Sequence, residues 1–204
     1  MEVSETTVEK PPVITIPKYL VYEMMDGKPI PYRGFREVLS KHKTLEDITG
    51  SSGLQSVIVV DRLLRFLFKH LSEDEYIIAG NEAGLHLSRK NNLATDIGVY
   101  TVNALPPEKL TDKYLDIPPL IAIEVDTKAD LSGFASPLDY FNQKTNKLLD
   151  FGVEKVIWIT SASRKVMVAT AGQDWTISDW NKPVAILPSV SCNLADLLAK
   201  RGIK

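Results

Sequence analysis

The apolar run at residues 120–125, LIAIEV, constrains the fold of this 204-residue chain more than any other feature. A short, continuous apolar run rich in isoleucine and valine predicts a buried β-strand. Glu124 lies inside this run, and Asp126 follows two residues later on the same face, because side chains alternate along a strand. An unpaired carboxylate is costly to bury, so we expect these acids to have a partner.

A second predicted strand carries a carboxylate in a similar setting. Strict alternation would place Ala94, Asp96 and Gly98 on one face of this strand. Glu124 has Ala122 as its neighbour on the same face, so both acids are flanked by small residues that leave room beside them. A solvated face would explain one such strand, whereas two of them favour a shared acidic pocket.

A pair of carboxylates kept from bulk water repels unless the two share a proton or a cation. Mg²⁺ takes one or two protein carboxylates, several waters and phosphate oxygens of a substrate. We therefore expect Asp96 and Glu124 to bind Mg²⁺ (or Mn²⁺). Such a site is typical of phosphodiester hydrolysis, in which the metal lowers the pKa of a water and neutralises developing charge.

A lysine is expected on the buried face of a predicted helix at residues 137–151, which ends at Gly152. Lys144 falls between Phe141 and Phe151 in the apolar arc of this helix, at about 100° per residue. We expect this buried arc to consist of Leu138, Phe141, Thr145, Leu148, Leu149 and Gly152. Such a lysine can also cover apolar surface with its stem while its ammonium reaches water. Beside two acidic strands, Lys144 is the expected ammonium of the site, where it would orient the attacking water and stabilise the phosphate.

The remaining patterns predict one α+β (α/β-like) domain over residues 14–204, after a flexible tail at residues 1–13. Asp26-Gly27 is typical of a tight hairpin turn. We expect helices at residues 35–40, 44–49, 54–70 and 194–200. We expect further strands within residues 14–32 and at residues 76–80, 84–88, 95–101, 120–126, 155–160, 165–169 and 175–177.

Composition narrows the function without identifying it. The formal net charge is −2 and the pI is about 6.0, which argues against a DNA-coating protein but not against a nuclease with a local basic groove. Cys192 is the one cysteine and cannot form an internal disulfide. The polar, acidic opening does not have the pattern of a secretory signal, and no run approaches the roughly 18 apolar residues of a membrane span. We expect a soluble cytoplasmic protein with no membrane contact.

The order of these motifs resembles a known superfamily. Asp96, the strand end Glu124-Val125, and the run KTNKLLDFGVEKVIWI beginning at Lys144 are similar to the PD-(D/E)xK nucleases, and within them to the Uma-two family of restriction endonuclease-like proteins. The resemblance implies a restriction-endonuclease-like central mixed β-sheet flanked by helices. It also implies a metal-dependent endonuclease that hydrolyses DNA, with Asp96, Glu124 and Lys144 as catalytic residues. A homodimer is plausible, because cleaving both strands of a duplex usually needs two copies.

The same resemblance points to further residues and to departures. Glu23, in the segment YEMMDG, matches an acid near the metal in the family, and Gln55 replaces a histidine early in the first long helix, so both are further candidate catalytic residues. Asp126 stands where the E-x-K pattern has lysine, so Asp126 is a third metal-ligand candidate and Lys128 is an alternative to Lys144. Glu82 is a spare acid near a predicted strand start. The alternative function is a non-catalytic binding or regulatory module with a nuclease fold.

Overall fold

The computed structural model describes residues 15–200 and 202. The tail predicted at residues 1–13 lies outside the described residues. Within the described part, no helix combines the length and the apolar character needed to cross a bilayer.

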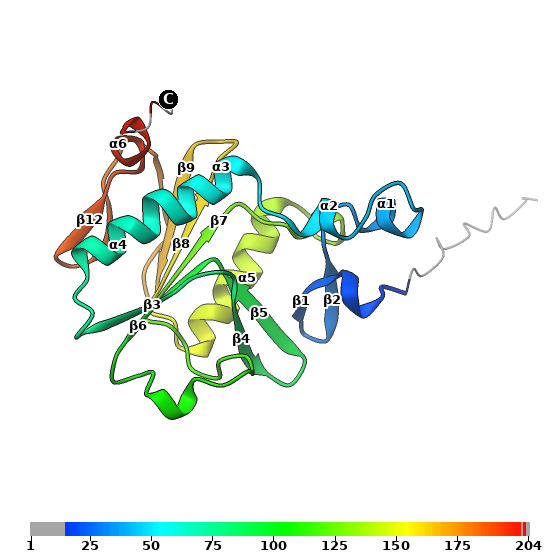
Figure 1. Ribbon diagram of the computed structural model, residues 1–204, viewed down its shortest axis with the longest axis horizontal. Helices are drawn as coiled ribbons and strands as arrows, with labels where there is room; N and C mark the ends of the chain where they lie inside the picture. Colours follow the sequence, from blue (N-terminus) through cyan, green and yellow to red (C-terminus); the bar gives the residue numbers. More distant parts are fainter. Residues whose placement is uncertain (1–14, 201, 203–204) are drawn as a thin grey trace, which may run out of the picture.

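A mixed sheet forms the centre of the fold (Figure 1). Within residues 15–200 and 202, this sheet has six strands in the order β10-β9-β8-β7-β6-β3. They are β3 (Tyr76–Ala79), β6 (Ile97–Thr101), β7 (Ile121–Val125), β8 (Lys155–Thr160), β9 (Lys165–Thr170) and β10 (Thr176–Asp179). The β7–β8 pair is parallel and the other neighbouring pairs are antiparallel. Every residue of β7 is buried, which explains its apolar sequence.

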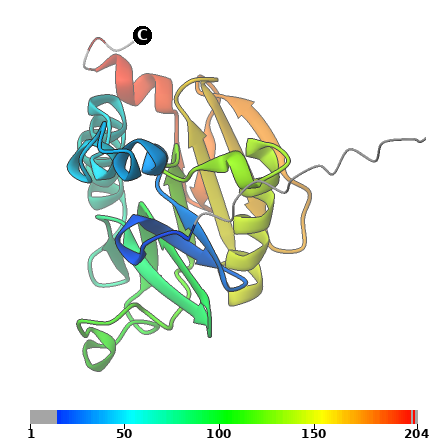
Figure 2. The same ribbon diagram turned by 90° about the vertical axis from the view of Figure 1, so that its right-hand side faces the viewer.

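Helices cover both faces of this sheet (Figure 2). On one side, residues 53–70 form a helix whose consecutive parts are α3 (Gly53–Ser56), a π-helical segment η2 (Val57–Leu64) and α4 (Arg65–His70). On the other side, α5 (Pro137–Phe151) supplies the crossover that the parallel β7–β8 pair requires. The prediction of a mixed α+β fold is therefore confirmed.

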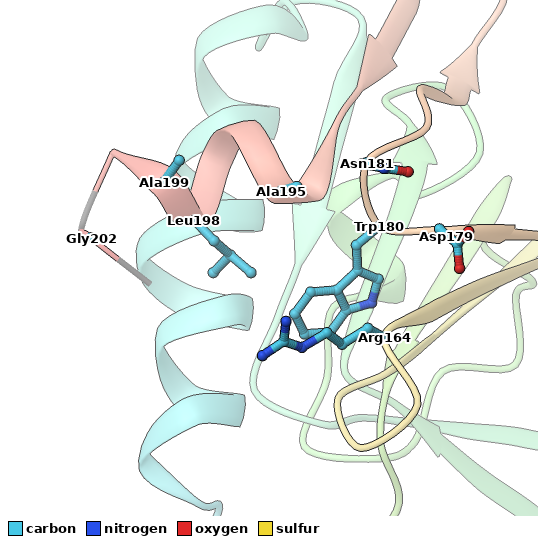
Figure 3. A pocket seen from close by; sticks show the side chains of 8 residues that line it. All are labelled: Arg164, Asp179, Trp180, Asn181, Ala195, Leu198, Ala199 and Gly202. Carbon is cyan, nitrogen blue, oxygen red and sulfur yellow. The ribbon is translucent and has the colours of Figure 1, made fainter. Parts of the chain in front are cut away.

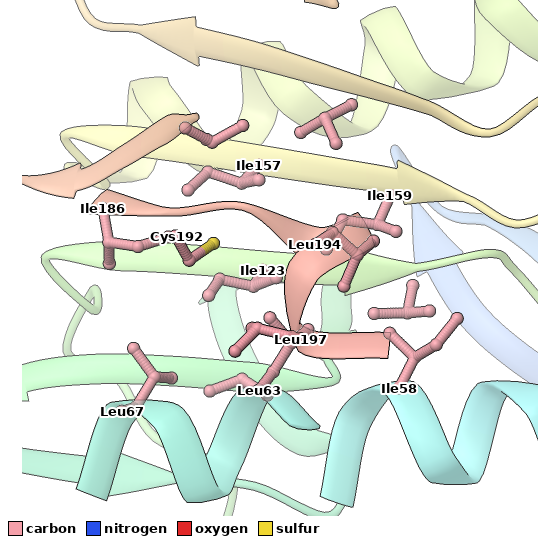
Figure 4. Packing of buried hydrophobic residues seen from close by; sticks show 14 of the residues in the cluster. Ile58, Leu63, Leu67, Ile123, Ile157, Ile159, Ile186, Cys192, Leu194 and Leu197 are labelled. Atoms are coloured by element: carbon pink, nitrogen blue, oxygen red, sulfur yellow. The ribbon is translucent and has the colours of Figure 1, made fainter. Parts of the chain in front are cut away.

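A large apolar core lies between the sheet and the helix at residues 53–70 (Figure 4). Side chains from the sheet and from that helix meet here, among them Ile58, Leu67, Ile123 and Ile157. The C-terminal part of the chain closes the same core through β11 (Val184–Leu187), β12 (Val190–Cys192) and α6 (Leu194–Ala199). Cys192 is buried in this core.

A second sheet packs beside α5 and delivers part of the site. Its order is β2-β1-β5-β4, formed by β1 (Val21–Met25), β2 (Lys28–Pro31), β4 (Ala83–Ser88) and β5 (Asn91–Thr95). Residues of these strands share an apolar cluster with Tyr140, Leu148 and Trp158. The β1–β2 turn is Asp26-Gly27, with φ of 50° and 73°, as expected for a tight hairpin.

Short helices occupy the remaining connections. They are η1 (Lys18–Leu20), α1 (Phe35–Leu39), α2 (Glu46–Thr49), η3 (Pro107–Lys109) and η4 (Leu131–Gly133).

Three details of the sequence-based prediction are wrong. The expected strand at residues 95–101 is broken at Asp96, which lies between β5 and β6, so strict alternation does not place this residue. Leu138, assigned to the buried arc of α5, is 54 % exposed, and Tyr140 is buried instead. The strands β5, β11 and β12 were not predicted.

Candidate active site

Two buried carboxylates meet at the end of β7. Glu124 is the fourth residue of this strand and is 2 % exposed, and Asp96 lies at the break between β5 and β6 and is 8 % exposed. Asp96 Oδ2 accepts a hydrogen bond of 2.6 Å from the backbone N–H of Val125, the residue after Glu124. This bond holds the Asp96 carboxylate beside the end of β7.

Burial makes both acids hard to ionise. It raises the pKa of Asp96 to about 6, although the hydrogen bond from Val125 and the charge of Lys144 oppose the shift. Burial also raises the pKa of Glu124 well above its usual value, again against the charge of Lys144, and the nearby Asp96 and Glu23 raise it further. Asp96 and Glu23 are therefore close enough to Glu124 to disfavour its charged form.

Lys144 lies inside this group rather than in solvent. Its Nζ is 2.7 Å from Glu23 Oε1 and 3.0 Å from Glu124 Oε1, and the residue is 0 % exposed. Burial works to lower the pKa of Lys144, but the Glu124 and Glu23 carboxylates outweigh it and hold the pKa well above the usual range. Lys144 is therefore charged and joins two acids that come from different sheets.

Glu23 reaches the site from β1 and is held on both of its oxygens. Besides the contact with Lys144, Glu23 Oε1 accepts a hydrogen bond of 3.1 Å from the Ala94 amide. Glu23 Oε2 accepts one of 2.8 Å from the Tyr140 hydroxyl. Tyr140 precedes Lys144 by four residues on the same face of α5. Sequence reasoning missed Tyr140, because the predicted arc included Leu138 and left Tyr140 outside it.

Gln55 enters from the first turn of the helix at residues 53–70. The Ser52 side chain caps this helix by accepting a hydrogen bond of 3.1 Å from the Gln55 amide. Gln55 is 7 % exposed, and its Nε2 donates a hydrogen bond of 2.6 Å to the Val125 carbonyl. Val125 is thus fixed at its amide by Asp96 and at its carbonyl by Gln55.

Asp126 and Lys128 leave the strand in different directions. Asp126 has a left-handed backbone with φ of 56°, and its Oδ1 accepts a hydrogen bond of 2.7 Å from the Ser161 amide. This bond holds the Asp126 carboxylate toward the β8–β9 turn. Lys128 forms an ion pair with Glu82, which lies in the turn between β3 and β4.

Two clefts open beside these residues. The first, here called the acid cleft, has a volume of about 620 Å³ and is lined by Asp96, Glu82, Asn81, Gln55 and Lys128, among others. The second, here called the outer cleft, has a volume of about 920 Å³, and Arg33, Lys43 and Asp126 are among its lining residues. Gln55 and Lys128 line both clefts. They therefore form the junction between the two spaces.

A separate apolar cavity of about 500 Å³ lies beside α6, lined by residues such as Trp180, Leu198 and Arg164 (Figure 3). None of the site carboxylates named above lines it. It belongs to the C-terminal part of the fold and not to the site.

The residues present fit a hard divalent cation. Among the described residues, no group of three or more His, Cys, Asp or Glu side chains could hold a metal. Mg²⁺, however, binds through one or two carboxylates and keeps several waters. Asp96 lines the acid cleft, and Asp96 and Glu124 are two close acids whose raised pKa values a cation would reverse.

Comparisons with known proteins bear on the fold. No family model matches the chain. No curated protein sequence matches it either. Among solved structures, a protein from Anabaena variabilis ATCC 29413, described as a "putative nuclease belonging to DUF820", superposes with a TM-score of 0.65 at 16 % identity. The match covers 87 % of this chain and 89 % of that protein. At this identity the likeness shows the fold: the chain shares the mixed α+β architecture of that protein over nearly its whole length.

Proposed function

We propose that this chain is a metal-dependent endonuclease that hydrolyses phosphodiester bonds of DNA. The observation that carries the proposal is the buried group of Asp96, Glu124 and Lys144 at the end of β7, with Asp96 facing the acid cleft. The DUF820 protein of the same fold is described as a "putative nuclease", which supports the proposal. The order of the motifs favours the Uma-two family of PD-(D/E)xK nucleases.

Each residue of the group has a distinct role in this proposal. Asp96 and Glu124 would hold Mg²⁺ or Mn²⁺, and the Val125 hydrogen bond orients Asp96 for this task. A bound cation would lower the pKa of a water and neutralise charge that develops on the phosphate. Lys144 is fully buried and lines neither cleft, so in this proposal it holds the Glu124 carboxylate and does not make the contact with the attacking water and the phosphate that was expected from the sequence. Gln55 fixes the end of β7 through the Val125 carbonyl.

In this proposal Asp126 is a third candidate metal ligand, after Asp96 and Glu124. Its carboxylate would have to exchange the Ser161 amide for the cation, because the two interactions use the same group.

DNA is the proposed substrate. A homodimer remains a proposal too, suggested by the need to cut both strands of a duplex.

The test is a cleavage assay on supercoiled, linear and single-stranded DNA with Mg²⁺, with Mn²⁺ and with EDTA. We expect metal-dependent cleavage by the wild type, and its loss in Asp96→Asn and Glu124→Gln. Asp116→Asn is the matched control, because Asp116 is an exposed acid in a surface ion pair with Lys109. A wild type that cleaves none of the three substrates with either metal would refute the proposal.

One observation favours the alternative of a non-catalytic binding module. Gln55 takes the place where the family has a histidine, and its amide is committed to the Val125 carbonyl and cannot carry protons. For a binding module we expect DNA to bind without being cleaved, while metal still stabilises the fold. The same assay, combined with a measurement of DNA binding, separates the two functions.

A further inference from the structure

Two lysines lie near the carboxylates, and they differ in their access to a substrate. Lys144 is 0 % exposed, and its ammonium contacts the carboxylates of Glu23 and Glu124. The side chain of Lys128 is 11 % exposed and lines both the acid cleft and the outer cleft. A fully buried ammonium that lines neither cleft cannot contact a phosphate there, whereas an ammonium on the wall of a cleft can.

We propose that Lys128 binds a phosphate of the substrate strand at the junction of the two clefts, and that Glu82 competes with this phosphate for the ammonium. This inference rests on the proposed function and divides the work between the two lysines. Lys144 positions the metal-binding acids, and Lys128 contacts the substrate.

The arrangement of the clefts supports this position for the phosphate. Gln55 and Lys128 are shared by the two clefts, and Asp96 lines the acid cleft. A strand that runs from one cleft to the other therefore passes Lys128 as it approaches Asp96.

The backbone beside Lys128 is unusual in a way that favours a functional role for Glu82. Asn81 and Glu82 are consecutive residues with left-handed conformations, with φ of 63° and 56°. Both residues lie in the connection that runs from β3 of the central sheet to β4 of the second sheet. Backbone of this kind is often found at functional sites. Here it holds the Glu82 carboxylate against the Lys128 ammonium on the wall of the acid cleft.

This competition predicts opposite changes in DNA affinity when the charge of Lys128 or the charge of Glu82 is removed. Removing the Lys128 charge takes away a donor to the phosphate. Removing the Glu82 charge frees that donor and also removes a negative charge near the incoming phosphate. A pair with a purely structural role would not give this reversal, because either variant would then weaken the same local fold.

The experiment measures binding and cleavage separately. Binding is followed by fluorescence anisotropy of a labelled single-stranded DNA of about 16 nucleotides in EDTA, where no metal-dependent cleavage occurs. We expect Lys128→Met to weaken binding about tenfold and Lys128→Arg to retain most of it. We expect Glu82→Gln to bind about threefold more tightly. The slope of affinity against salt should fall by about 0.7 in Lys128→Met, as for one lost phosphate contact on a single strand.

Lys109→Met and Asp116→Asn are the matched controls, because they break an exposed ion pair away from the two clefts. Neither control should change the affinity. Thermal unfolding of each variant shows whether it remains folded, and Glu82→Gln tests the proposal even where Lys128→Met is poorly folded.

The outcomes separate this inference from the proposed function. A wild type that cleaves DNA, with Lys128→Met and Glu82→Gln unchanged in affinity, would overturn the role of Lys128 and leave the nuclease. Weaker binding by both variants would also overturn it. A wild type that binds DNA through Lys128 but never cleaves would support the phosphate site and refute the nuclease.

Discussion

Glu23 and Glu124 share one ammonium, yet their oxygens are not equally engaged. Glu23 accepts hydrogen bonds from the Tyr140 hydroxyl and the Ala94 amide in addition to its contact with Lys144. Among the described residues, the Glu124 carboxylate makes a single polar contact, between Oε1 and the Lys144 ammonium. A carboxylate with few protein donors is the better ligand for a cation, since its lone pairs remain available. Glu23 therefore acts as the counter-ion of Lys144 in the proposed site, and Glu124 as the metal ligand.

The first prediction follows from this difference. Mn²⁺ should raise the melting temperature of the wild type, because a ligand that binds the native state stabilises it by about 2.7 kcal/mol at a hundredfold excess over Kd. Glu124→Gln should lose this gain, and in EDTA it should be at least as stable as the wild type. Glu23→Gln should keep the gain. Thermal unfolding with EDTA and with Mn²⁺ measures all three proteins, and loss of the gain in Glu23→Gln would make Glu23 a ligand instead.

A second prediction concerns the buried ammonium. Lys144→Met leaves Glu23 and Glu124 without their cation, and breaking a buried pair in this way costs about 3–5 kcal/mol. Lys147→Met, three residues further along α5, breaks a contact with the exposed Asp26 and should cost far less. Urea unfolding of the two variants gives the comparison. Equal stabilities would show that the acids do not depend on Lys144.

The third prediction uses the pKa of Asp96, which burial raises from 3.8 to about 6. Between about pH 4 and about pH 6 the folded protein binds more protons at Asp96 than the unfolded chain does. The contribution of Asp96 to the free energy of unfolding is therefore fully present below about pH 4 and is lost as the pH rises to about 6. In EDTA, the stability of Asp96→Asn relative to the wild type should increase over this range. Urea unfolding across the range tests the sign, and a constant difference would contradict the shift.

At the scale of elements, periodicity predicted what local sequence determines. The helices at residues 53–70 and 137–151 have long apolar repeats and clear caps, and the structure has them within one residue of the expected ends. The strand β5, with the sequence NNLAT, is polar, and β11 and β12 are short, so no local pattern distinguished them. These strands form because they pair with distant or neighbouring strands, which sequence periodicity does not report.

The site residues also divide into those that local sequence predicts and those that only the fold brings together. Asp96, Glu124 and Lys144 could be predicted because each places a charge in an apolar setting. The link from Tyr140 to Glu23 joins residues 117 positions apart, so only the fold reveals it. The pairing of Lys128 with Glu82 likewise depends on how the β3–β4 turn lies against the end of β7.

The end of α5 supports a prediction at this scale. Gly152 has φ of 116°, and a Cβ there would lie 3.0 Å from Pro118 Cγ. Gly172 also has a positive φ, of 72°, but a Cβ there would meet no atom within 4 Å. Gly172→Ala should therefore cost about 1 kcal/mol from the backbone alone, and Gly152→Ala should cost more. Urea unfolding of both variants measures the difference in their free energies of unfolding. Equal losses would mean that Pro118 can move away from the added Cβ without a further loss of stability.

For the whole molecule, two tryptophans report on the two apolar cores. Trp180 lies in the core beneath the helix at residues 53–70, and Trp158 lies in the core beneath α5. Both cores rest on the same central sheet, so we expect them to unfold together. When Trp175 is also replaced by Phe, Trp158→Phe and Trp180→Phe each leave a single tryptophan in one core. For each protein, the unfolding transition followed by fluorescence should coincide with the transition followed by circular dichroism. Separate midpoints within one variant would contradict the expectation of a single domain.

The buried group has a consequence for which ions the proposed site accepts. When Asp96, Glu23 and Glu124 are ionised, Lys144 neutralises one of the three and leaves two negative charges in a place that water reaches poorly. One divalent ion balances that deficit, whereas a sodium or potassium ion leaves half of it uncompensated. Valence alone therefore separates Mg²⁺ from the far more abundant monovalent ions, before ionic radius or coordination geometry enters.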